Sequence, residues 1–325
     1  MLTQAQIEEL KYIYNSKNRF YHNFDHIEKM LYDLKEWYSH DLADQDADTL
    51  ETAIYFHDIV YSASSSTNEE DSVEFYKNFC EKEKIPFKQT VCDLIMITKN
   101  HKVKTRAGYL RELEKKMIRL DINILNEDYS ELIEYENKIF LEYQFLDIEK
   151  YIKGRVDFLN EVINNTLLNN ASNVRRLIKH IESRVYKIGI YPGAFSPFHK
   201  GHLNIVNKAE SVFDKVVIAK GINREKGKMD YQTPKSLINE IVEYDGLVTD
   251  LFYGVKNVKK FMIRGLRNEH DMNYEENLRR TIHDVMPNIE FVYFMCNSEY
   301  EHISSSMIRN LNKIDPKLTE KYIID

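Results

Sequence analysis

Two histidines in a loop give the first indication of chemistry in this chain. The apolar run 187–191 predicts a strand, which continues into the sequence PGAFSPFHKGH and then a helical pattern. In an open parallel sheet, ligands bind beyond the carboxyl ends of the strands, where loops lead into helices. Gly193 allows a tight turn. His199 and His202 lie three residues apart at the helix start, where free N–H groups favour an anion. We therefore expect both imidazoles to face one phosphate group.

Two further groups in the same half suit phosphate. Arg264 and Arg267 follow an apolar run, so two permanently charged guanidinium groups are expected at the carboxyl end of a strand. The serine triplet at 304–306 precedes a helical pattern, where hydroxyl and N–H groups can bind an anion. The alternatives are a surface ion pair with Glu269 or Asp271 for the arginines, and a simple helix cap for the serines.

In the other half of the chain, histidines and aspartates occur inside helical patterns. His22 and His26 lie four residues apart and can share one helix face. His57 and Asp58 lie within AIYFHDIVY, and Asp121 lies within IRLDINIL. A buried charge is costly unless it is paired or bound to metal. Imidazole and carboxylate ligands without thiolates suit a divalent metal ion that activates water. The alternative is a helical domain with satisfied polar residues and no metal.

The elements that must position these groups differ between the two halves. Residues 1–170 follow helical spacing with few glycines and prolines, which predicts an all-α domain with polar loops such as 62–71. Residues 171–185 are predicted to form a helical linker. From 186 to 325, short β-rich runs alternate with helical patterns, which predicts an α/β domain whose parallel sheet is covered on both faces. The predicted strands are 187–191, 216–219, 260–263 and 290–295, and the predicted helices are 201–213, 234–244 and 273–285.

Length and composition set the outer limits. The 325 residues suffice for two domains, and 43% hydrophobic with 30% charged residues is typical of globular proteins. A net charge of −7 argues against a broad nucleic-acid surface. We find neither a signal-peptide pattern nor an apolar stretch able to span a bilayer. Three widely spaced cysteines fit a reducing compartment. We therefore expect a cytoplasmic protein without nucleic-acid or membrane partners.

The C-terminal motifs resemble those of one enzyme family. GAFSPFHKGH is similar to the G-x-F-x-P-x-H-x-G-H signature of cytidylyltransferase-like nucleotidyltransferases. RGLRNEHDMNYE at 264–275 and HISSSMIR at 302–309 resemble motifs of bacterial pantetheine-phosphate adenylyltransferases, and GLVTD at 246–250 resembles that family's segment after its third strand. The resemblance implies a Rossmann-like domain that transfers AMP from ATP to 4′-phosphopantetheine, giving dephospho-coenzyme A and pyrophosphate in coenzyme A biosynthesis.

The same resemblance implies roles for individual residues. His202 and His199 would bind the α-phosphate region, and Lys226, Arg264 and Arg267 would hold phosphates during the catalytic step. Mg²⁺ would accompany ATP. The residues that it implies bind ATP are Gly193, Ala194, Phe195, His202, Arg267, Glu275, Ser304, Ser305 and Ser306.

The C-terminal half departs from the family pattern at two positions. The family usually has G-T-F-D-P, whereas this chain has Ala194 and Ser196 in place of the threonine and the aspartate. The acceptor therefore stays open, with nicotinamide mononucleotide as the alternative small phosphorylated acceptor. Lys228 lies close enough to Lys226 to shift the alignment there. The family tends to form oligomers, so a homo-oligomer is an open expectation.

The order H…HD…D resembles the HD-domain metal-dependent phosphohydrolases over about residues 15–165. This resemblance implies that Asp58 has a catalytic role and that Arg19 and Lys99 are candidate phosphate contacts. A divalent ion such as Mn²⁺, Fe²⁺ or Mg²⁺ would be bound. The implied metal ligands are His26, His57, Asp58 and Asp121, with His22 and His101 as candidates for phosphate binding or a second metal.

Together these resemblances predict a bifunctional enzyme. The N-terminal domain would hydrolyse a nucleotide or related phosphate ester, and the C-terminal domain would transfer AMP. One alternative is that the HD domain is a non-hydrolytic regulator of the transferase. Another is a nucleotide-binding scaffold without catalysis, which fits the retained histidines, arginines and serines poorly.

Overall fold

The computed structural model describes residues 2–324 apart from 17, 39, 41, 165–167, 170 and 223–238. The chain forms two compact units. The first comprises Met1–Leu146 and Lys150–Glu182, and the second comprises Asp147–Glu149 and Ser183–Asp325. The predicted linker 171–185 coincides largely with a helix, α9 (Ser172–Ser183), which buries an apolar stripe that includes Val174 and Leu177.

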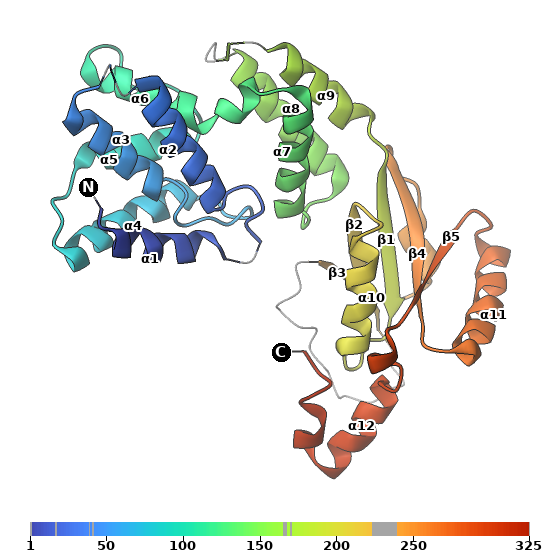
Figure 1. Cartoon of the computed structure of the whole chain (residues 1–325). Coiled ribbons are helices and arrows are strands. Elements are labelled where there is room, and N and C mark those ends of the chain that lie inside the picture. Colours follow the sequence, from blue (N-terminus) through green and yellow to red (C-terminus); the bar gives the residue numbers. More distant parts are fainter. Residues whose placement is uncertain are drawn as a thin grey trace. The chain divides into compact units, whose positions relative to one another are not determined.

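The described residues of the first unit form helices joined by loops, as predicted (Figure 1). Its α-helices are α1 (Gln4–Tyr14), α2 (Phe24–Tyr38), α3 (Asp44–Phe56), α4 (Asn68–Glu83), α5 (Gln89–Thr98), α6 (Tyr109–Asp121), α7 (Tyr129–Glu142), α8 (Ile148–Asn164) and α9, with a 3₁₀ turn η1 (Asn123–Asn126) after α6. The predicted loop 62–71 is too long, because α4 already begins at Asn68. Among the described residues, no helix is long and apolar enough to cross a membrane.

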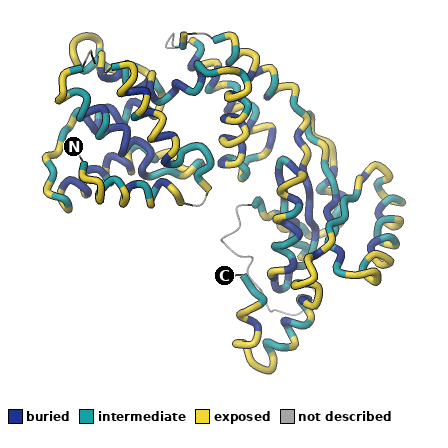
Figure 2. The backbone as a smooth tube through the Cα atoms, in the orientation of Figure 1, coloured by how far each residue is buried: buried dark blue, intermediate teal, exposed yellow. Residues whose placement is uncertain are grey.

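Apolar helix stripes form the core of this unit. Leu50, Ile54 and Phe56 of α3 are fully buried, and so are Leu94 and Ile95 of α5. Helices α3 and α5 contact each other and α6, and Figure 2 shows buried residues gathered along the inner sides of these helices. The apolar run of α3 leads directly into His57 and therefore delivers this polar residue to the interior.

The second unit contains a five-stranded parallel sheet, which confirms the predicted sheet type. Its strands are β1 (Tyr186–Gly193), β2 (Lys215–Gly221), β3 (Glu240–Tyr244), β4 (Val258–Leu266) and β5 (Glu290–Met295), in the order β3-β2-β1-β4-β5. The helices are α10 (Lys200–Glu210), α11 (Glu269–Val285) and α12 (Ser305–Ile314), with 3₁₀ turns η2 (Val248–Phe252), η3 (Ser298–Tyr300) and η4 (Pro316–Thr319). Helix α10 contacts β2, β4 and β5, and α11 contacts β4.

One predicted helix is wrong. Residues 240–244 of the predicted helix 234–244 form the edge strand β3, which pairs with β2 from Val217↔Glu240 to Gly221↔Tyr244. Residues 234–238 lie outside the described part of the chain. The sequence EIVEY is short and contains two adjacent β-branched residues, and periodicity cannot distinguish a helix from a strand over so few positions. Backbone pairing with β2 decides the outcome.

A glycine at the centre of the sheet allows the layers to approach closely. A Cβ added to Gly189 of β1 would lie 2.5 Å from side-chain atoms of both Ile263 and Phe213. These side chains belong to the main apolar cluster of the unit. The tight packing fixes β1 between β2 and β4, so the loops after β1 and β4 leave the sheet at the same edge.

Candidate functional site

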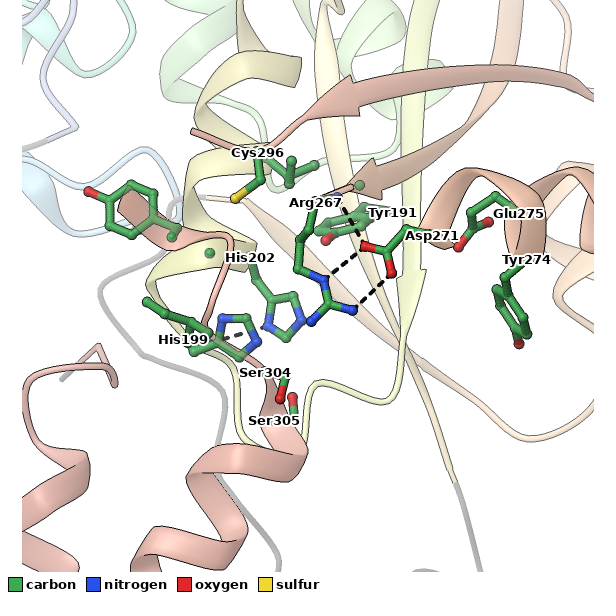
Figure 3. Close-up of a pocket in the computed structure, with 15 residues that line it drawn as sticks. Tyr191, His199, His202, Arg267, Asp271, Tyr274, Glu275, Cys296, Ser304 and Ser305 are labelled. Carbon is green, nitrogen blue, oxygen red and sulfur yellow. Dashed lines mark hydrogen bonds and ion pairs between the residues drawn. The ribbon is translucent and has the colours of Figure 1, made fainter. Parts of the chain in front are cut away.

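The loop after β1 brings the two predicted histidines into direct contact. His199 is the N-cap residue of α10, and its backbone N–H donates to Nδ1 of His202 at 3.3 Å. The two rings stack with centroids 3.6 Å apart. Figure 3 shows them next to each other. A Cβ on Gly201 would lie 3.1 Å from the His199 ring, so glycine gives this ring its room. The H-x-G-H spacing therefore builds a compact imidazole pair at a helix N-terminus.

Both imidazoles are held neutral. Burial and, to a smaller extent, the nearby Arg267 guanidinium together lower the pKa of His199 to about 4. Burial also lowers the pKa of His202 well below its usual value, with additional contributions from His199 and Arg267. The Nδ1 atom of His199 is buried and has no hydrogen-bond partner among the described residues. A pair of neutral imidazoles beside a cation suits an anionic ligand.

Each predicted arginine is held by a carboxylate of α11. Arg264 donates from Nε and Nη2 to the carboxylate of Glu275 at 2.6 and 2.7 Å, and from Nη1 to the Pro192 carbonyl. Arg267 donates from Nε and Nη2 to Asp271 at 2.9 and 3.0 Å. The ion pair considered as an alternative therefore forms for Arg267 with Asp271, whereas the partner of Arg264 is Glu275. Both guanidinium groups are oriented by two-point pairing.

A cavity of about 300 Å³ joins several of these groups. Its wall includes the imidazole pair, Arg267, Asp271 and Glu275, and two serines at the start of α12. Figure 3 shows the imidazoles, the Arg267 fork and the two serine hydroxyls around one space. The predicted residues that line this cavity are His199, His202, Arg267, Glu275, Ser304 and Ser305.

The remaining predicted residues lie elsewhere. Gly193, Ala194 and Arg264 line a neighbouring cavity of about 500 Å³. Phe195 is buried in the apolar cluster, and the Ser306 hydroxyl accepts a hydrogen bond from Arg309. Lys226 and the alternative Lys228 lie outside the described residues.

Sequence reasoning missed the role of Arg309. Its Nη1 donates to the carbonyl of Ser196 at 2.5 Å, and the Ser305 hydroxyl donates to the carbonyl of Pro197 at 3.0 Å. Ser304 caps α12 by accepting from the Met307 N–H. Helix α12 is thereby fastened to the loop that carries the histidines. The signal in the sequence that could have indicated this role is a basic residue one helical turn after the serine triplet.

In the first unit, the predicted metal ligands converge. One potential ligand atom each from His26, His57 and Asp58 lie within 4.8 Å of one another. The Nδ1 atom of His57 lies 2.9 Å from the Ile54 carbonyl, so Nδ1–H donates to that carbonyl and Nε2 faces the cluster. This Nε2 is buried without a hydrogen-bond partner among the described residues. The donor set therefore fits a divalent cation.

Asp121, at the end of α6, joins the other side of this cluster. Its carboxylate lies 3.2 Å from Nε2 of His26, 3.6 Å from Nε2 of His57 and 3.0 Å from Nε2 of His101. Burial would lower the pKa of His57, but the carboxylates of Asp58 and Asp121 outweigh it and raise that pKa well above its usual value. The pKa values of both aspartates are lowered despite burial, by the surrounding imidazoles. The carboxylates are therefore ionised.

A buried carboxylate that the sequence did not reveal orders the start of α2. Glu142 accepts through Oε1 from the backbone N–H groups of Phe20, Tyr21 and His22 at 2.7–3.0 Å. Its Oε2 lies 2.6 Å from Nδ1 of His22 and accepts from the Tyr61 hydroxyl at 2.8 Å. These contacts fix the His22 ring. A glutamate in a helical pattern is usually exposed, so its burial could not be predicted from the residue pattern.

Arg19 and Lys99, the two proposed phosphate contacts of this unit, both contact protein groups. Arg19 donates to the carbonyls of Asp58 and Ile59 at 2.6 and 2.9 Å, and thus supports the backbone behind the cluster. Lys99 pairs with the carboxylate of Glu70. Lys99 still lines a cavity of about 380 Å³, whose predicted site residues are His22, Asp58, His101 and Asp121.

Comparison with known proteins places the resemblance in the second unit. Residues 190–311 match the cytidylyltransferase-like family. The chain is 36% identical over 138 residues to the phosphopantetheine adenylyltransferase of Cytophaga hutchinsonii, a match that covers 40% of this chain and 91% of the relative. It is 36% identical over 134 residues to that of Mycoplasma capricolum subsp. capricolum, covering 38% and 96%, and 31% identical over 142 residues to that of Alkaliphilus metalliredigens, covering 41% and 90%.

Proposed function

Because the chain belongs, through its α/β unit, to the phosphopantetheine adenylyltransferase family, we propose that this unit transfers AMP from ATP to 4′-phosphopantetheine. A phosphate oxygen of the acceptor would form a bond to the α-phosphorus of ATP as the bond to the β-phosphate bridge breaks. The products would be dephospho-coenzyme A and pyrophosphate. Such a transfer depends on positioning and on stabilising charge, with no covalent enzyme intermediate required.

The observation that carries this proposal is the neutral imidazole pair beside Arg267. His199 and His202 stack at the N-terminus of α10, on the wall of the same cavity as the Arg267 guanidinium. Neutral imidazole N–H groups, a fixed cation and a helix N-terminus can all stabilise negative charge that develops on the α-phosphate oxygens. Mg²⁺ bound with ATP would neutralise part of the charge on its phosphates.

The neighbouring cavity supports phosphopantetheine as the acceptor. Arg264 lines it and could hold the acceptor phosphate, while Met262, Leu278 and Ile282 form an apolar wall. A long, weakly polar arm would bury its surface there favourably. Among the described lining residues, Arg264 and Tyr244 provide the polar side-chain groups, so the charged ring and ribose hydroxyls of nicotinamide mononucleotide would find few polar partners there. Ala194 lines the same space and adds no hydroxyl.

The direct test is pyrophosphate release from MgATP by the full-length protein. 4′-Phosphopantetheine and nicotinamide mononucleotide are supplied separately, with a no-acceptor control for ATP hydrolysis. We expect release with 4′-phosphopantetheine alone, and dephospho-coenzyme A as the second product. Pyrophosphate release only with nicotinamide mononucleotide would show that 4′-phosphopantetheine is not the acceptor. No release with either compound would contradict the proposed AMP transfer.

We further propose that the helical unit is a metal-dependent phosphohydrolase of the HD type. The observation that favours it is the convergence of His26, His57, Asp58 and Asp121 on one buried point, where Nε2 of His57 faces both carboxylates. These residues would hold Mn²⁺, Fe²⁺ or Mg²⁺. The ion, when bound, would polarise a water molecule for attack on phosphorus.

Two measurements test this second proposal on the full-length protein. Metal analysis after incubation with Mn²⁺, Fe²⁺ or Mg²⁺ and removal of excess ion should find bound ion. Phosphate release from nucleotides and sugar phosphates should then depend on that ion. Bound metal without hydrolysis, together with nucleotide-dependent changes in the AMP-transfer rate, would instead identify a regulatory domain.

A further inference from the structure

A second cavity lies beside the proposed metal ligands His26, His57, Asp58 and Asp121 of the helical unit, hereafter called the metal cluster. It has a volume of about 320 Å³ and is bordered by α7 and α8. It shares a wall with the 380 Å³ cavity that contains Asp58 and Asp121. The residues that line both cavities are His22, His101, Tyr135, Tyr143 and Phe158.

The walls of this α7–α8 cavity are rich in aromatic rings. Phe158 stands at its junction with the metal cluster, where its ring contacts that of His101 edge-on with centroids 5.8 Å apart. Tyr135 and Tyr143 continue the aromatic surface, and Ile139 adds an aliphatic side chain. A planar π system would bind to such a surface by stacking, which adds binding free energy to that of apolar burial alone.

One fixed positive charge belongs to the same wall. Arg155 is 8% exposed, and its Nε donates to the carboxylate of Glu136 at 2.8 Å. Its guanidinium lies over the rings of Tyr135 and Phe158, 4.8 and 5.1 Å from their centroids. Because the pairing and stacking hold the group in place, the cavity combines aromatic faces with a positively charged edge. Nucleobases offer the complementary features, a planar ring and electron-rich carbonyl or ring-nitrogen edges.

A glycine leaves the mouth of the cavity open. Gly154 lies inside helix α8, where glycine is less favourable than alanine, and it lines the cavity. An added Cβ would meet no described atom within 4 Å. Packing therefore does not require glycine here, and a large side chain at this position would extend into the open space beside it.

We infer that the α7–α8 cavity binds the base of a nucleoside monophosphate whose phosphate reaches the metal cluster. The inference rests on the proposed hydrolase function and specifies its substrate class. In the reaction, a water oxygen would bond to phosphorus while the bond from phosphorus to the nucleoside 5′-oxygen breaks. The proton from water would pass to that oxygen, so the products are a nucleoside and orthophosphate.

The first experiment compares substrates that differ only in the base. With Mn²⁺-loaded full-length protein, kcat/KM is measured for GMP, UMP and ribose 5-phosphate. Stacking of one base corresponds to roughly 10- to 100-fold in affinity, so we expect both nucleotides to exceed ribose 5-phosphate by about that factor. Equal values for all three substrates would overturn the inference. Butyl phosphate cleaved as fast as the nucleotides would also overturn it, because an aliphatic chain would then suffice.

Variants at the cavity mouth provide the second experiment. Gly154→Phe should reduce kcat/KM for GMP and UMP to the level of ribose 5-phosphate, and leave ribose 5-phosphate within about twofold of wild type. Gly154→Ala and Lys153→Phe, the latter at an exposed position of the same helix, should retain the preference for nucleotides. If Gly154→Phe fails to fold by circular dichroism, Gly154→Leu replaces it. A uniform loss for all substrates in a folded variant would contradict a base subsite.

A binding measurement separates the inference from the proposed hydrolysis. If no substrate releases phosphate, the proposed hydrolase function fails, and UMP is instead titrated calorimetrically into the Mn²⁺-loaded wild type and Gly154→Phe. At least tenfold weaker binding to the variant would support a base-binding cavity in a non-hydrolytic domain. Equal affinity, or no binding to either, would overturn the inference.

Discussion

Histidines of the two units lie in opposite electrostatic surroundings. In the α/β unit, His199 and His202 stack on each other near Arg267, and their pKa values are lowered by burial and by that cation. In the helical unit, His57 contacts Asp58 and Asp121, whose charges raise its pKa. The residue type is the same, so the neighbouring charge distinguishes the ligands that we propose for the two sites. Imidazoles beside an arginine suit a phosphate, and imidazoles among ionised carboxylates suit a metal ion.

The supports behind the histidines differ as well. His199 is a helix N-cap, so its position follows from the turn between β1 and α10. His57 is anchored by the Ile54 carbonyl within its own helix turn, and His22 by Glu142 from a distant helix. The imidazole pair of the proposed phosphate site thus depends mainly on one local motif, whereas the proposed metal site requires several helices to assemble.

The largest expected effect is the loss of one activity without loss of the other. In the double variant His57→Ala, Asp58→Ala, two of the converging ligands are lost, so we expect the helical unit to lose bound metal and all metal-dependent hydrolysis. AMP transfer should stay within about twofold of wild type, because the phosphate site is built from residues of the other unit. Metal content is measured by mass spectrometry after gel filtration, beside pyrophosphate release.

A matched double variant controls for this experiment. His40→Ala, Asp44→Ala removes one histidine and one aspartate from exposed positions of the same unit, and both activities should persist. Full metal retention in the His57→Ala, Asp58→Ala protein would reject the ligand set. Loss of AMP transfer in that protein would show that the two sites are coupled.

The next effect tests the phosphate side of the comparison. His202→Ala removes one of the two stacked imidazoles, and loss of a preorganised donor to a developing oxyanion costs roughly 10²–10³ in kcat. We expect a fall of that size in pyrophosphate release, while metal binding by the helical unit is unchanged. His40→Ala serves as the control. Near-normal turnover of the variant would show that the catalytic step does not require His202.

The contrast also explains what the sequence could predict. The H-x-G-H turn and the His-Asp dipeptide depend on neighbours in the chain, so their local geometry was predictable. Glu142 lies 120 residues from His22 in sequence, and Arg309 lies 113 residues from Ser196. Contacts that depend on tertiary packing over such separations leave no periodic signal. The edge strand β3 was missed because its pairing with β2, rather than its own pattern, fixes it.

Glu142→Gln tests one of these long-range supports. The amide keeps the shape of the side chain but loses the charge that holds three backbone N–H groups, Nδ1 of His22 and the Tyr61 hydroxyl. Loss of a group that orients a metal-site residue typically costs 10- to 100-fold in activity or metal affinity. We expect that loss in hydrolysis and none in AMP transfer. Glu134→Gln, exposed on the same helix α7, should leave both unchanged, and a wild-type rate for Glu142→Gln would make its contacts dispensable.

The smallest effect concerns protonation of the phosphate site. Because the pKa of folded His199 is about 4 and its usual value is 6.5, the unfolded state binds more protons between these values. The contribution of neutral His199 to stability is therefore present above pH 6.5 and is lost as the pH falls toward 4. Each pH unit within this window changes the local opening equilibrium by up to about tenfold.

Hydrogen exchange of the β1–α10 segment, corrected for intrinsic rates, measures this opening. We expect faster opening as the pH is lowered from 6.5 to 5.5 in the wild type. In His199→Asn the side chain is a favourable N-cap for α10 but cannot take up a proton, so the pH dependence should weaken. The same pH dependence in both proteins would place the titration elsewhere. That result would contradict the lowered pKa of His199. The contrast between neutral imidazoles in one site and imidazoles beside carboxylates in the other would then no longer hold.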